Sequence, residues 1–241
     1  AVRPDAPELA AAERRDAPTT CRARGNDADD FTPRKVDGDT CRRAFAATPD
    51  VEDAADADTN NIYLVNLIAT DAGSNTDTIA LTITVVNTND EPPVFGDGAT
   101  DAQSVNEGTT ALGADYDVTD ADTSDLFNDL STCTDSGNDA ADFTPTKVDA
   151  DTCRMAFAAT PDYESAADAD TNNIYLVNLI ATDAGSNTDT IALTITVVDL
   201  NDNSPVFADG ASNAENVNEG TTTVADYNLA DADSTDAVDT C

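Results

Sequence analysis

The strongest constraint on the fold of this chain is a long internal repeat. Residues 54–86 and 166–198 are identical at all 33 positions, AADADTNNIYLVNLIATDAGSNTDTIALTITVV, at an offset of 112. The same offset relates Phe31 to Phe143 and residues 106–108 to residues 218–220. Solenoid repeats span roughly 20–50 residues, whereas a period of 112 residues matches a small complete domain. The sequence therefore predicts a tandem array of domains.

The repeat divides the chain into four expected segments. Residues 1–19 have no counterpart elsewhere in the chain and form an unmatched N-terminal segment. Residues 20–92 correspond to the C-terminal part of a first repeat, and residues 93–204 to a complete second repeat. Residues 205–241 correspond to the N-terminal part of a third repeat.

Within each repeat, apolar side chains alternate with a period of two residues. Residues 190–198 read TIALTITVV and residues 173–182 read NIYLVNLIAT, and Asp, Asn, Gly and Pro cluster on either side of such segments. This pattern is typical of half-buried strands. About seven short strands in a repeat of this size predict an all-β fold, an antiparallel β-sandwich repeated in tandem.

Charge is the second strong feature of the chain. It carries 48 acidic and 11 basic residues, a net charge of -37, and nine of the basic residues fall within the first 43 positions. Nucleic acid and anionic membranes are poor partners for such a chain, because binding phosphates requires clustered Lys and Arg. With no His in the sequence, a His-based catalytic triad and a His-ligated zinc site are excluded. Cations are the expected partners.

The cysteines recur with the repeat. Cys21 and Cys41 are 20 residues apart, as are Cys133 and Cys153. A disulfide within each repeat is the natural interpretation, and a loop of that length would stabilise the fold by about 3 kcal/mol. It would also place the protein in an oxidising compartment. Buried free thiols are the alternative.

Oxygen-bearing side chains concentrate where the last strand of the second repeat ends. The segment 199–205 reads DLNDNSP, an extended connector unsuited to a hydrophobic core. Calcium takes six to eight oxygen ligands from carboxylates, amides and backbone carbonyls. Closely spaced carboxylates repel one another unless a cation lies among them. The connector therefore predicts a cation site.

At this connector the chain resembles the cadherin family, whose linker between domains reads DxNDNxPxF, here residues 199–207. Residues 106–108 (NEG) resemble the glutamate motif of the first strand, and residues 120–122 (DAD) the DxD motif. Residues 161–164 (PDYE) resemble the LDYE motif with Pro for Leu, and residues 181–185 (ATDAG) the AxDxG motif. The resemblance implies Greek-key, immunoglobulin-like β-sandwiches with three calcium ions between consecutive domains.

The resemblance also implies which residues bind these ions. For the second junction they are the side chains of Glu107, Asp162, Glu164, Asp199, Asn201, Asp202, Asp231 and Asp233, with carbonyls of Leu200 and Asn203. For the first junction they are Asp50, Glu52, Asn87, Asn89, Asp90, Asp120, Asp122 and Asp183. The first linker, residues 87–91, reads NTNDE and departs from the family pattern at both ends. We therefore expect the first junction to bind fewer ions or to bind them more weakly.

The function implied by the resemblance is a calcium-rigidified cell-adhesion module of a cell-surface protein. Its partners would be other cell-surface proteins, including further copies of the same protein, and a segment outside this chain would anchor it to the plasma membrane. No enzymatic activity is expected, because the acidic residues recur in each repeat at linker positions. Two alternatives remain: a non-adhesive stalk or accessory repeats of a larger secreted enzyme, and intrinsic disorder, which the low aromatic content of 5% would permit.

Overall fold

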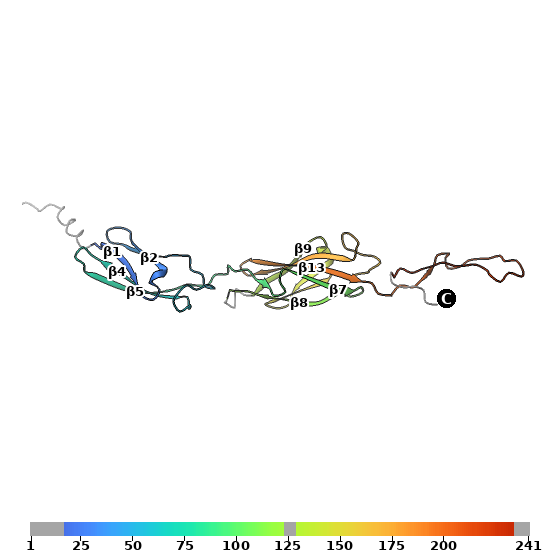
Figure 1. The fold of residues 1–241 in the computed structure, drawn as a ribbon, viewed down its shortest axis with the longest axis horizontal. Helices are drawn as coiled ribbons and strands as arrows, with labels where there is room; N and C mark the ends of the chain where they lie inside the picture. The colour runs from blue at the N-terminus through green and yellow to red at the C-terminus, as the bar shows by residue number, and fades with distance from the viewer. Residues whose placement is uncertain (1–16, 123–128, 234–241) are drawn as a thin grey trace, which may run out of the picture. The chain divides into compact units, whose positions relative to one another are not determined.

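The protein is represented by a computed structural model that describes residues 17–122 and 129–233. The chain forms two compact units, Ala1–Thr88 and Asn89–Cys241 (Figure 1). Most of the unmatched segment 1–19 lies outside the described residues. Among the residues that are described, no helix is long and apolar enough to span a membrane.

The second unit is a sandwich of two four-stranded sheets. Its strands are β6 (Val94–Phe95), β7 (Thr100–Asn106), β8 (Ala111–Thr119), β9 (Leu130–Ser136), β10 (Phe143–Lys147), β11 (Thr152–Phe157), β12 (Ile174–Asp183) and β13 (Thr188–Val198). A short 3-10 helix, η2 (Ala140–Asp142), precedes β10. The strand order is β7-β13-β12-β9 in one sheet and β10-β11-β8-β6 in the other. The expected all-β sandwich is thereby confirmed.

One strand pairing differs from the antiparallel prediction. Strand β7 runs parallel to β13, with Thr100 opposite Ala192 and Asn106 opposite Val198. The chain leaves β6 in one sheet and crosses to the edge of the other before β7 begins. Gly98 lies in this crossover with a φ of 84°, and its N–H donates to the Phe95 carbonyl at 3.1 Å. Glycine adopts that left-handed conformation without the steric cost of a Cβ.

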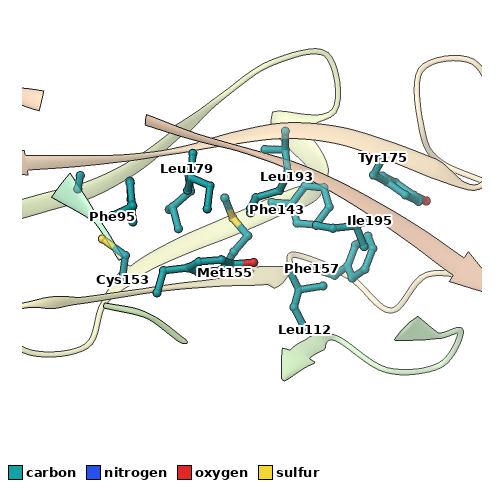
Figure 2. Packing of buried hydrophobic residues seen from close by; sticks show 14 of the residues in the cluster. Phe95, Leu112, Phe143, Cys153, Met155, Phe157, Tyr175, Leu179, Leu193 and Ile195 are labelled. Atoms are coloured by element: carbon teal, nitrogen blue, oxygen red, sulfur yellow. The ribbon is translucent and has the colours of Figure 1, made fainter. Parts of the chain in front are cut away.

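The core of the second unit lies between its two sheets (Figure 2). Every second side chain of β13 points into this core, and these four residues, Ile191, Leu193, Ile195 and Val197, are at most 2% exposed. Met155 comes from the opposite sheet and is fully buried. Full burial stabilises each such apolar side chain by about 1.5–3 kcal/mol. The period-two pattern therefore identified the buried face correctly.

The first unit contains the same elements from β9 onward. They are β1 (Thr20–Arg24), η1 (Ala28–Asp30), β2 (Phe31–Lys35), β3 (Cys41–Phe45), β4 (Ile62–Thr70) and β5 (Thr76–Thr84). They form the sheets β1-β4-β5 and β2-β3. The described part of this unit has no counterpart of β6, β7 or β8. Its buried core is correspondingly small and consists of Phe31, Tyr63 and Val65.

Both predicted disulfides are present. Cys21 is bonded to Cys41 in the first unit, and Cys133 to Cys153 in the second. Each bond joins a strand of one sheet to a strand of the other. The alternative of buried free thiols is therefore wrong for these four cysteines.

Residues 205–233 extend beyond the second sandwich. Two short strands, β14 (Val206–Phe207) and β15 (Leu229–Ala230), pair antiparallel with each other. Most side chains between them are exposed.

Candidate metal centre

Glu107 directly follows β7 and connects three parts of the second unit. Its side chain is 4% exposed. One carboxylate oxygen accepts the N–H of Tyr163 and the other accepts the N–H of Leu200, each at 2.7 Å. Strand β7, the loop before β12 and the linker after β13 are therefore held at one buried carboxylate.

Two further carboxylates approach Glu107. One oxygen from each of Glu107, Glu164 and Asp199 lies within 4.8 Å of the others, and we call these residues the glutamate group. Burial raises the pKa of Glu164, and the negative charges of Glu107, Asp199 and Asp233 raise it further. Crowded carboxylates raise each other's pKa in this way when no cation separates them.

Glu164 also belongs to a second cluster. Its oxygen lies within 4.8 Å of oxygens from Asp202 and Asp233, and we call these three residues the linker group. Burial raises the pKa of Asp202, and the charges of Glu107 and Asp233 are the next causes. Since Glu164 is shared, the glutamate and linker groups form one continuous acidic cluster between the second sandwich and residues 231–233.

Asn203 organises the linker group. Its backbone N–H donates to Asp233 Oδ2 at 3.0 Å. Its side-chain amide donates to Glu164 at 3.1 Å and to Asp233 Oδ1 at 3.0 Å. The family resemblance had assigned only the carbonyl of Asn203 a role. The amide also donates to Asp202 Oδ1 at 3.1 Å. The structure thus adds a contribution from the Asn203 side chain, which contacts all three carboxylates of the linker group.

A third cluster, the aspartate group, lies at the other end of β12 and β13. Oxygens of Asp120, Asp122 and Asp183 lie within 4.8 Å of one another. Asp122 is fully buried and Asp183 is 2% exposed. Asp120 Oδ2 and Asp122 Oδ1 are buried without a hydrogen-bond partner among the described residues. Burial raises the pKa of Asp120, followed by the charges of Asp122 and Asp183.

Sequence reasoning missed Asn187, which holds the aspartate group against the first linker. Its backbone N–H and side-chain amide donate to the two oxygens of Asp183 at 2.7 and 2.8 Å. The same amide donates to Asn89 Oδ1 at 2.9 Å. A Cβ on Gly185 would overlap the Asn89 side chain, which explains the glycine of the AxDxG motif. Asn75 makes the same two bonds to Asp71 in the first unit, at 2.8 Å each. Recurrence in the sequence does not single out Asn187, because all 33 positions of this segment recur.

The remaining predicted ligands occupy other positions. Asp162 caps the loop before β12 by accepting the N–H of Ser165 at 2.9 Å, while Leu200 and Asn201 are exposed in the linker. Asp231 accepts the N–H of Asp233 at 3.2 Å. Asn89 and Asp90 are the first two residues of the second unit. Asp50, Glu52 and Asn87 lie in the first unit, where Asp50 accepts the N–H of Glu52 at 2.9 Å.

The chemistry of these groups fits a hard divalent cation. All the ligand atoms offered are oxygens, which calcium and magnesium prefer to nitrogen or sulfur. A buried carboxylate oxygen without a donor is costly, and a bound cation would remove that cost. The unpartnered oxygens of Asp120 and Asp122 therefore favour a cation in the aspartate group.

Comparisons with known proteins agree with the resemblance, although no family model matches the chain. Mouse protocadherin Fat 4 is 30% identical over 156 residues, covering 64% of this chain and 3% of that protein. Human protocadherin Fat 1 is 28% identical over 206 residues, covering 78% of this chain and 4% of that protein. The chain thus spans a few per cent of the length of these curated relatives.

Solved structures show the same tandem fold. Human CDH23 EC21-23 matches with a TM-score of 0.57 and 24% identity, covering 89% of this chain and 74% of that one. A protocadherin gammaB7 EC3-6 cis-dimer structure matches with a TM-score of 0.58 and 25% identity, covering 90% and 48%. The disulfides and this fold imply an extracellular location. The chain is a region of cadherin repeats, distantly homologous to the Fat protocadherins and matched in fold by cadherin extracellular domains.

Proposed function

We propose that the glutamate, linker and aspartate groups bind calcium. Cadherin extracellular domains bind calcium at acidic linker sites, and candidate acidic groups of this kind are present here. The observation that carries the proposal is the shared carboxylate of Glu164, which approaches Glu107 and Asp199 on one side and Asp202 and Asp233 on the other. Ions bound there would connect the second sandwich, its linker and residues 231–233.

The proposed effect of the ions is mechanical. Without a cation, the carboxylates of each group repel one another and favour an open arrangement. A ligand that binds only the ordered arrangement stabilises it by RT ln(1 + [L]/Kd), which is about 2.7 kcal/mol at a hundredfold excess over Kd. In this proposal, residues 20–92, 93–204 and 205–241 are parts of successive repeats whose connections calcium stiffens.

We further propose that the array serves in cell adhesion, with other cell-surface proteins or further copies of this protein as partners. The name of one structural match describes a protocadherin cis-dimer, which supports association between arrays of this fold. Cadherin repeats are a non-catalytic family, so we propose no enzymatic activity for the chain. A non-adhesive stalk, or accessory repeats of a larger secreted enzyme, would use the same calcium chemistry.

Isothermal titration with calcium tests the binding proposal. The wild-type chain should bind calcium, and Glu164→Gln should weaken or abolish the binding that the glutamate and linker groups provide. Glu219→Gln is the control with the same change of charge, because Glu219 is the counterpart of Glu107 in residues 218–220 and is exposed. Equal calcium binding by Glu164→Gln and the wild type would refute the assignment.

Limited proteolysis tests the mechanical effect. Cleavage at Asp202 by an endoproteinase specific for Asp should be rapid in chelator and slow in calcium. The same rate in both conditions would show that calcium does not order the linker.

A further inference from the structure

One outer surface of the second sandwich carries no charged side chain. In the sheet β7-β13-β12-β9, every second residue of each strand points away from the core, and we call this surface the neutral face. All of its residues are exposed or half-buried. They are Thr100, Ala102, Ser104 and Asn106 on β7, Thr188, Thr190, Ala192, Thr194, Thr196 and Val198 on β13, Ile174, Leu176, Asn178, Ile180 and Thr182 on β12, and Thr132, Thr134 and Ser136 on β9. Charged residues make up 24% of the chain, so their absence from four neighbouring strands sets this surface apart.

The strand pairing makes the neutral face continuous. Thr194 lies opposite Ala102 on β7 and opposite Leu176 on β12. Asn178, the next outward residue of β12, lies opposite Ser136 on β9. Side chains that lie opposite each other on one face of a sheet are about 5 Å apart. The neutral face therefore extends over all four strands without a break.

The sheet on the other side of the sandwich is charged on its outer surface. Asp115 and Asp117 on β8 are exposed. Arg154 on β11 makes a two-pronged salt bridge to Asp115, at 2.5 and 2.6 Å. Copies of a chain with a net charge of -37 repel one another. The neutral face lets two copies approach without bringing like charges into contact.

The polar groups of the neutral face suit pairing with an identical face. A Thr or Ser hydroxyl and an Asn amide can each donate and accept a hydrogen bond, so such a residue can bond to its own equivalent. A carboxylate only accepts and an Arg or Lys side chain only donates, so charged residues cannot pair in this way. The face also offers apolar area for burial, since Leu176, Val198 and Ile174 are 50%, 41% and 39% exposed.

The first unit has the same hairpin but a different edge strand. Strands β4 and β5 have the sequence of β12 and β13. On β1, exposed Arg22 and Arg24 stand at the positions of Thr134 and Ser136, and Arg22 lies opposite Ile68 of the hairpin. A neutral face has no acidic residue to pair with these arginines, so covering them would cost free energy. Within the described part of the chain, a matching neutral face must therefore come from a second copy.

We propose that the neutral face of the second unit binds the neutral face of a second copy. A two-fold axis would relate the two copies, so that the same patch lies on both sides of the contact. The inference rests on the proposed association between copies of the protein and assigns it to one surface. It concerns the second unit alone and is independent of where the first unit lies.

The size of the neutral face indicates a weak dimer. Strands β7 and β9 have 7 residues each, β12 has 10 and β13 has 11. At about 3.3 Å per residue and about 4.8 Å between strands, they present roughly 550 Å². Two copies would together bury about 1,100 Å², just below the range of about 1,200–2,000 Å² for stable complexes. Association should therefore appear between about 10 μM and about 1 mM protein.

Charge-swap variants of Leu176 test whether the face pairs with itself. Sedimentation velocity of the full chain at constant calcium should show concentration-dependent dimerisation of the wild type. Leu176 lies near the middle of the face, so Leu176→Glu and Leu176→Lys each place two like charges in a two-fold contact. Each variant alone should have a dissociation constant at least about tenfold higher than the wild type. An equimolar mixture of the two should dimerise again, because opposite charges then meet.

The first unit provides the matched control. Leu64 is the equivalent of Leu176 in an identical hairpin and is 51% exposed. Leu64→Glu makes the same change of charge in the same local sequence, and it should dimerise like the wild type. Circular dichroism checks that each variant is folded.

Two further measurements separate this contact from effects of overall charge. Thr134→Arg combined with Ser136→Arg gives the second unit the two arginines of the first. This variant should dimerise at least about tenfold more weakly although its net negative charge is smaller, whereas overall repulsion alone would predict stronger association. Raising NaCl from about 50 mM to about 500 mM should strengthen dimerisation of the wild type, because salt screens the repulsion between anionic copies. Association of the basic first unit with an acidic surface would weaken instead.

The outcomes distinguish failure of this inference from failure of the proposed function. A wild type that stays monomeric up to about 1 mM would refute both the association of copies and the role of the neutral face. If the wild type dimerises and Leu176→Glu dimerises equally well, copies associate through another surface. A mixture of Leu176→Glu and Leu176→Lys that stays monomeric would show that the face does not meet itself. An equal loss in Leu64→Glu would show that the contact is not specific to the second unit.

Discussion

Replacing Glu107 by Gln separates two roles of this carboxylate, which are to accept two backbone N–H groups and to contribute to the proposed calcium site. Each of its oxygens accepts one backbone N–H, from Tyr163 and from Leu200, at 2.7 Å. Gln keeps one acceptor oxygen and presents an NH₂ group to the other donor. Leaving one buried N–H unpaired costs about 1–3 kcal/mol. Removing a negative charge beside Glu164 and Asp199 relieves repulsion. The free energy of unfolding in chelator should therefore fall by only about 1 kcal/mol.

The free energy of unfolding of Glu107→Gln should fall further in calcium than in chelator. At a hundredfold excess over its Kd, calcium stabilises the wild type by about 2.7 kcal/mol. If Glu107→Gln weakens binding about a hundredfold, the same calcium concentration stabilises the variant by about 0.4 kcal/mol. The variant should therefore lose about 2.3 kcal/mol of calcium-dependent stability, in addition to its loss in chelator.

Native-state hydrogen exchange, measured by NMR, provides the local assay. The amide protons of Tyr163 and Leu200 should exchange more slowly in calcium than in chelator in the wild type. In Glu107→Gln both should exchange faster, and calcium should slow them little. The control Glu219→Gln should behave as the wild type. Equal calcium-dependent protection in the wild type and in Glu107→Gln would refute the role of this carboxylate.

Three other perturbations have defined outcomes. Replacing Cys133 and Cys153 by Ser should lower the free energy of unfolding by about 3 kcal/mol, measured by urea denaturation, and an unchanged midpoint would contradict a stabilising disulfide. Asp120→Asn should stabilise the fold in chelator at pH 7, because the pKa of Asp120 is raised by burial and by neighbouring charges. That gain in stability should vanish as the pH falls below the pKa of the unfolded chain, about 3.9. In calcium at pH 7, Asp120→Asn should instead destabilise the fold. Thermal melts that show the same change in stability at every pH would contradict this reasoning. Asn187→Ala keeps the backbone bond to Asp183 but removes the side-chain bond. It should weaken calcium binding about 10–100-fold, and unchanged affinity in a titration would show that the side-chain bond does not orient the ligand.

The buried face of the second unit was predictable from local pattern. Ile191, Leu193, Ile195 and Val197 alternate with polar residues, and all four lie in the core as expected. The identical residues of the first unit show where such reasoning stops, since Ile79 is 56% exposed. Period-two alternation identifies which face of a strand is apolar, but coverage depends on strands that come from elsewhere in the chain.

The candidate site was predictable to a similar extent. The motifs placed Glu107, Glu164 and Asp199 in one site, and the structure brings their oxygens together. Motif matching could not show that the side-chain amides of Asn187 and Asn203 hold carboxylates in place. The bond from Asn203 to Glu164 joins residues 39 positions apart, and the amide that holds Asp183 also bonds to Asn89, 98 positions away, so the folded topology determines both contacts.

The central claim, that these acidic groups bind calcium, is tested most directly by counting bound ions. Native mass spectrometry in millimolar calcium should show specifically bound ions on the wild type. Glu164→Gln and Asp183→Asn should each lose ions, while Glu219→Gln should keep the full number. If all four proteins carry the same number of ions, or none, the acidic groups are not calcium sites and the account is wrong.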